Sequence, residues 1–109
     1  MLNIIYTDVF KTNVAALSDN QIEEHVSGII KSFKNNGMHS YEFIICNELM
    51  IYAFRAAVKR KKIPHDKICF IFKINNKTSE PFYLDKDAKF IKYPTCYISL
   101  FDKYLSELM

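Results

Sequence analysis

Glycine is scarce in this sequence, whose 109 residues include only Gly28 and Gly37. A G-x-x-x-x-G-K phosphate loop and a G-x-G-x-x-G dinucleotide turn both need closely spaced glycines, because the backbone must approach the phosphate groups. Two glycines that lie nine residues apart exclude both motifs from the chain. We therefore expect no cofactor.

Cysteine is also scarce, and Cys46, Cys69 and Cys96 form no C-x-x-C pair. This spacing excludes a zinc ribbon and argues against a disulfide framework, and no other ligand spacing indicates a metal site. Three cysteines without evident partners favour a reducing compartment, so we predict a cytoplasmic protein. The longest uncharged runs, such as 49–54 and 68–72, are too short to cross a bilayer, and we expect no membrane partner.

The composition is that of a folded globular protein. Half of the residues are apolar, 15% are aromatic and 25% are charged, with a formal net charge of +3. These proportions argue against disorder, and the length suits one unit of structure. We predict that residues 1–109 form a single α/β domain.

Apolar periodicity predicts strands that alternate with helices. The clearest helix begins at a capping box, Ser18 to Gln21, and ends near Gly37. A second helix begins at Glu48 after the N-cap Asn47 and runs to about Lys62. The expected fold is a three-layer α/β structure with a mainly parallel sheet in βαβαβ order, a C-terminal β-hairpin and a closing helix. The expected strands are 2–6, 41–46, 67–74, 81–84 and 89–92, and the closing helix follows Pro94.

Two side chains at predicted strand ends are candidates for chemistry. Asp8 follows the first strand, where open α/β sheets bind ligands and where a carboxylate can hold Mg²⁺; a turn or capping role is the alternative. Cys46 precedes a helix N-terminus, which lowers a thiol pKa, yet no histidine is placed beside it by local spacing. A buried structural cysteine is the simpler interpretation.

The positive balance of the chain is concentrated in one cluster. Lys59, Arg60, Lys61 and Lys62 are consecutive, and Arg55 lies one helical turn earlier. Such a cluster binds phosphates electrostatically, so a small nucleic-acid-binding protein is one hypothesis. Cations that complement a helix C-terminus are the alternative interpretation.

Two segments resemble part of the ABC-type ATPases of the OLD and Septu-like group. The first contains Glu48-Leu49-Met50-Ile51, Arg55-Ala56-Ala57-Val58 and the Lys62-Ile63-Pro64 turn that leads into the aromatic strand 68–72. The second, Phe82 to Pro94, is similar to their Ile-Asp-x-Asp-Gly-Arg-Phe-x-x-Trp-Pro stretch, with Ala88 for the glycine and Tyr93 for the tryptophan. The resemblance implies a degenerate, stand-alone C-terminal half of such an ATPase.

The resemblance also implies that catalysis is lost. It places Asp8 at the Mg²⁺-associated position of the Walker B strand, but Val9 replaces the glutamate that orients the attacking water. Cys46-Asn47-Glu48 stands where Thr-His-Ser is expected, so the γ-phosphate-sensing histidine is missing. Asp8, Asn47 and Glu48 are thus a remnant of a nucleotide and metal site rather than an active one.

The function expected from the resemblance is a non-catalytic protein-interaction or regulatory module, set in anti-phage defence or counter-defence. Its partner would be a related ATPase, a nuclease or a second copy of the chain. Two alternatives stay open beside it. One is nucleic-acid binding through Arg55 and Lys59 to Lys62, and the other is a cryptic enzyme built on Asp8, Glu48 and Cys46.

Overall fold

The elements alternate as the sequence predicts. A computed structural model of the chain describes residues 1–7, 19–45, 48–94 and 97. The order is β1 (Leu2–Thr7), α1 (Asp19–Asn35), β2 (Tyr41–Ile45), α2 (Glu48–Lys59), a 3₁₀ turn (His65–Lys67), β3 (Ile68–Ile74), β4 (Lys77–Thr78) and β5 (Phe82–Tyr83).

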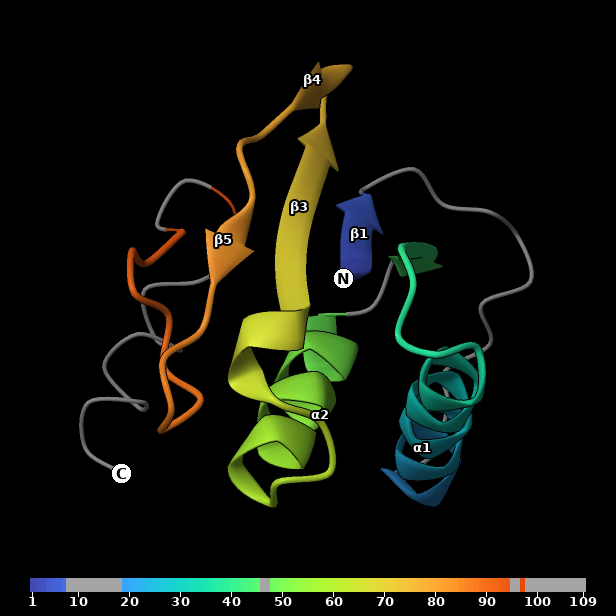
Figure 1. Cartoon of the computed structure of the whole chain (residues 1–109). Coiled ribbons are helices and arrows are strands. Elements are labelled where there is room, and N and C mark those ends of the chain that lie inside the picture. Colours follow the sequence, from blue (N-terminus) through green and yellow to red (C-terminus); the bar gives the residue numbers. More distant parts are fainter. Residues whose placement is uncertain (8–18, 46–47, 95–96, 98–109) are drawn as a thin grey trace.

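The five strands form one mixed, open sheet with β1 and β3 as its inner strands (Figure 1). β1 pairs in parallel with β2 on one side and with β3 on the other, so that Ile4 lies beside both Phe43 and Phe70. β4 and β5 pair antiparallel with successive parts of β3. The parallel centre of the sheet is therefore extended by antiparallel strands on the β3 side.

Helix α1 forms because its apolar residues recur on one face. Ile22, Val26 and Phe33 are among the buried residues of that face, whereas the intervening charged residues are exposed. The helix ends as predicted at Gly37, which has a φ of 73° and donates its amide to the carbonyl of Lys34. Met38 donates to the carbonyl of Phe33, which completes a Schellman motif.

Helix α2 ends earlier than the predicted Lys62. Its last helical residue is Lys59, and the amides of Lys61 and Lys62 bond back to the carbonyls of Val58 and Ala57. This is again a Schellman motif, but its left-handed residue is Lys61, with a φ of 60°. This ending is not predictable from the residue type, because the left-handed position of the motif usually carries glycine.

Both helices lie on the same face of the sheet. His25 of α1 contacts the ring of Phe43 in β2, and Arg55 of α2 contacts Phe90, which in turn packs on Phe70 of β3. Phe43 and Phe70 flank Ile4 in register, so they share one face. The described residues therefore form two layers, and the predicted third layer is not seen among them.

The predicted hairpin is present and tighter than expected. Asn75 and Asn76 both have positive φ values, of 53° and 62°, as a type I′ turn requires. β4 follows at once and pairs with the end of β3, while β5 pairs with its beginning. The strand predicted at 89–92 is reduced to a single bridge between Leu84 and Phe90. The predicted closing helix falls on residues outside the described ranges, apart from Tyr97.

Candidate functional site

The carboxyl edge of the sheet is where the sequence places the remnant site. β1 and β2 run side by side and end at Thr7 and Ile45, and α2 begins at Glu48. Asp8, Cys46 and Asn47 lie outside the described residues. Of the predicted remnant, the structure therefore places only Glu48, a half-buried residue in the first turn of α2.

The histidines of the described residues form no hydrogen bond or ion pair with a cysteine or carboxylate side chain. His25 and His39 are exposed, and the Nδ1 atom of His65 lies 3.2 Å from the carbonyl oxygen of Leu84, where it joins two loops. The described part of the chain also contains no group of histidine, cysteine and carboxylate side chains able to hold a metal ion.

Cys69 is a cysteine that sequence reasoning did not single out. It is buried in β3, and its Sγ donates to the Oδ1 atom of Asn3 over 3.0 Å. Burial raises the pKa of the Cys69 thiol, and the positive amino terminus only partly opposes this effect. Burial and the bond to Asn3 make Cys69 part of the packing between β1 and β3.

Arg55 is separated from the rest of the predicted basic cluster. The residue is only 9% exposed, its Nε donates to the carbonyl oxygen of Ala88 over 2.9 Å, and its guanidinium carbon lies 5.0 Å from the ring centre of Phe90. These contacts join α2 to the turn at residues 85–90. The structure thus places Arg55 in the interior, where it is not exposed to bind a phosphate backbone.

The other four cations form an exposed surface, which we call the basic turn: Lys59, Arg60, Lys61 and Lys62. Within the described part of the chain, its recorded ion pair joins Nη1 of Arg60 to Oε1 of Glu23 over 3.9 Å. Both side chains are largely exposed, and such pairs contribute little to stability. The basic turn is therefore open to an anionic partner.

A shallow groove runs between α1 and α2 beside the basic turn. Its walls include Val26, Ser27 and Ile30 from α1 and Ala53, Ala56 and Ala57 from α2, and Arg60 and Lys62 stand at its margin with Glu23. We call it the helix groove. Small alanine side chains create it, because they leave space between helices that pack directly on each other.

A third surface is the outer edge of β2, which sequence reasoning missed. Among the described residues, β2 pairs only with β1, so its outer side is an open strand edge. Ile44 is 62% exposed, and Met38 and Leu49, which flank the strand, are exposed as well. We define these three side chains and the strand as the β2 edge. The alternation of Glu42 with apolar neighbours was the available signal, since it marks a half-exposed strand.

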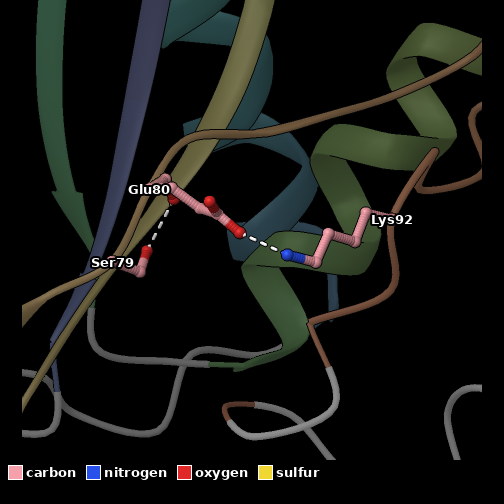
Figure 2. A network of polar contacts seen from close by, with 3 residues as sticks. All are labelled: Ser79, Glu80 and Lys92. Atoms are coloured by element: carbon pink, nitrogen blue, oxygen red, sulfur yellow. Dashed lines mark hydrogen bonds and ion pairs between the residues drawn. The ribbon is translucent and has the colours of Figure 1, made fainter.

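The opposite edge of the sheet, beyond β3, is covered by a later segment of the same chain. Figure 2 shows Lys92 reaching Glu80, with 2.6 Å between Nζ and Oε1, while the hydroxyl of Ser79 donates to the carbonyl of Glu80. A hollow beside this contact is walled by Phe82, Tyr93 and Tyr97. Tyr97 stacks on Phe72 at 5.1 Å, so the hollow is an aromatic margin of the core.

No helix of the described residues is both long enough and apolar enough to span a membrane. Comparison with models of known protein families, with curated proteins and with solved structures finds no match to this chain. The ATPase resemblance therefore stays a prediction from the sequence.

Proposed function

We propose that this chain is a non-catalytic protein-interaction module whose binding surface is the β2 edge. The observation that carries the proposal is a strand edge that no described residue pairs with, in a strand whose Ile44 side chain is largely exposed. An open edge presents unpaired N–H and C=O groups, which pair readily with an extended segment of another chain. Exposed apolar groups beside it add the burial that such a contact needs.

Ile44 is one of the five large apolar side chains that the described residues expose, and Met38 and Leu49 lie before and after its strand in the sequence. Ile44 points away from the helices, since its neighbour Phe43 contacts His25 of α1. A partner strand that pairs with β2 would therefore cover Ile44 on one face of the sheet. The remaining two, Tyr83 and Ile91, lie beyond β3, where the Ile91 amide donates to the carbonyl of Tyr83.

The ATPase resemblance supports a role without catalysis and suggests partners. A degenerate half of an ABC-type ATPase, with Asp8, Asn47 and Glu48 as the remnant of its site, would act by contact with a related ATPase, with a nuclease or with itself. The setting we propose is anti-phage defence or counter-defence in the cytoplasm. We also propose that the complete chain has the three-layer arrangement of that family.

Affinity capture combined with light scattering tests the binding surface. We expect the purified chain either to form an oligomer in light scattering or to retain a related ATPase or nuclease when the two are co-expressed. Ile44→Lys should abolish the contact, because it places a charge in an apolar strand interface. Tyr83→Lys is the matched control, since Tyr83 is exposed on the opposite side of the sheet.

Two results would contradict the proposal. Equal loss of binding in Ile44→Lys and Tyr83→Lys would show that the β2 edge has no special role. Tight binding of Mg-ATP with turnover by the isolated chain, measured by calorimetry and phosphate release, would show that the module is catalytic.

A further inference from the structure

We infer that the basic turn and the helix groove together bind an acidic peptide segment that carries an aliphatic side chain. This surface is formed by α1, α2 and the residues that follow α2, and the inference does not depend on the β2 edge.

The helix groove supplies the apolar half of the site. Val26, Ile30 and Ala57 are buried beneath it, and Ala53 and Ala56 are partly exposed along it. Its volume of about 70 Å³ suits one small aliphatic side chain rather than a drug-sized ligand. A leucine or valine from a partner would cover carbon atoms that are now in contact with water.

The basic turn supplies the charge. Its four side chains are exposed, and Arg60 and Lys62 stand where a chain lying in the groove would pass them. The long Arg60–Glu23 contact is easily exchanged, because both groups remain hydrated. Carboxylates that flank an aliphatic anchor would meet these cations, so the surface is complementary to an acidic segment.

The backbone of the basic turn explains where its cations stand. Lys61 adopts a left-handed conformation that disfavours residues with a Cβ by roughly 1 kcal/mol relative to glycine. Helix α1 ends in the same motif with Gly37, so the fold itself does not require a lysine at such a position. The turn that Lys61 completes holds Arg60 and Lys62 at the exposed end of α2, beside the groove.

An acidic peptide fits this surface better than a nucleic acid does. The described lining of the groove contains no aromatic ring, and base stacking on aromatic rings is a main source of single-strand affinity. Arg55, which the sequence grouped with the cluster, is buried and leaves a shorter basic surface. The apolar floor beside the cations offers no favourable contact to a phosphate backbone, whereas an aliphatic side chain of a protein can pack on it.

Fluorescence anisotropy with a short labelled peptide of glutamates, with leucines at helical spacing, tests the inference. We expect the wild-type chain to bind it, and Arg60→Glu with Lys62→Glu to weaken binding by about tenfold or more through charge reversal. Lys31→Glu with Lys34→Glu is the matched control on exposed residues of α1 and should change the affinity far less. Circular dichroism verifies that each variant is folded.

A gain of affinity provides a second arm. Glu23→Gln removes the carboxylate that competes for Arg60 and should tighten binding, whereas Glu24→Gln, an exposed neighbour, should not. A peptide with serine in place of leucine should bind more weakly than the leucine peptide.

Three outcomes would overturn the inference. The first is no peptide binding at low salt, and the second is equal binding of the serine and leucine peptides. The third is that the chain binds a mixed-sequence DNA duplex or single strand but not the peptide, and that the Arg60 and Lys62 variant loses this DNA binding. That last result would assign the basic turn to nucleic acid instead.

Discussion

The two sides of the sheet are built differently, although both flank the same inner strands, β1 and β3. Beyond β3, the chain folds back on itself through β4, β5 and the Leu84–Phe90 bridge, and Lys92 ties the end of this segment to Glu80. Beyond β1, β2 has no second neighbour among the described residues and exposes Ile44. We refer to the first as the closed side and to the second as the β2 edge.

The difference shows which strand edge the described residues cover and which one they leave uncovered. Soluble proteins protect open edges with charges, prolines or covering segments, because exposed edges associate with other chains. The closed side has such protection, with Pro81 and a cover of aromatic rings around Phe82. The β2 edge carries only Glu42 as an exposed charge, which is consistent with a surface that binds a partner.

The largest expected difference between the two sides is in their contribution to stability. Phe82 is 5% exposed and packs edge-on against Phe72, so Phe82→Ala should lower the free energy of unfolding by about 3–4 kcal/mol. Ile44→Thr, which keeps a β-branched residue at the β2 edge, should change it by about 0.5 kcal/mol or less. Urea denaturation monitored by tyrosine fluorescence measures both. Equal losses would show that the β2 edge is part of the core.

A smaller effect is expected from the buried arginine of the closed side. Arg55→Met keeps most of the side-chain volume but removes the bond to the Ala88 carbonyl and the contact with Phe90, and should cost about 2 kcal/mol. Arg60→Met on the exposed basic turn should cost about 0.5 kcal/mol or less. Similar losses in the two variants, measured by the same denaturation, would contradict the interior role of Arg55.

Alkaline pH should act on the closed side through Cys69. Because burial raises the pKa of this thiol, the unfolded chain releases the thiol proton at a lower pH than the folded protein does. The contribution of Cys69 to the free energy of unfolding is therefore constant below the ordinary thiol pKa and falls as the pH rises above it. Cys69→Ala should lose stability less steeply than wild type at alkaline pH. If the free energies of unfolding of wild type and Cys69→Ala fell in parallel with pH, this expectation would be refuted.

The smallest effect concerns the turns that begin each side. Asn76 of the type I′ turn has a positive φ, so Asn76→Gly should stabilise the closed side by about 0.5 kcal/mol. Ser40 precedes β2 and is not among the residues with positive φ, so Ser40→Gly should instead destabilise by a similar amount, roughly 0.5 kcal/mol. Thermal unfolding measures the sign of each change, and the same sign in both would contradict the turn assignment.

Local sequence patterns predicted the helices and the parallel strands well. The period of Ile22, Val26 and Ile29 and the cap at Gly37 are properties of a short segment, and the structure confirms them. The end of α2 was predicted too late, because the left-handed conformation of Lys61 depends on hydrogen bonds rather than on residue type.

Features that depend on distant parts of the chain were not predictable. Arg55 is buried because Ala88 and Phe90, more than thirty residues away, supply its partners. The exposure of Ile44 depends on β2 lying at the end of the strand order, which no local pattern encodes. The placement of both described helices on one face of the sheet is also set by tertiary packing, which no local pattern encodes.

Site-specific photocrosslinking distinguishes a β2 edge that binds a partner from one that does not. One variant carries benzoylphenylalanine in place of Ile44 at the β2 edge, and a second carries it in place of Tyr83 on the closed side. Both are irradiated as purified chains and in cells that co-express a related ATPase or nuclease. We predict a discrete crosslink from position 44, to a second copy or to that partner, and little or none from position 83. Crosslinks from position 83 alone, or equal crosslinks from both, would contradict it.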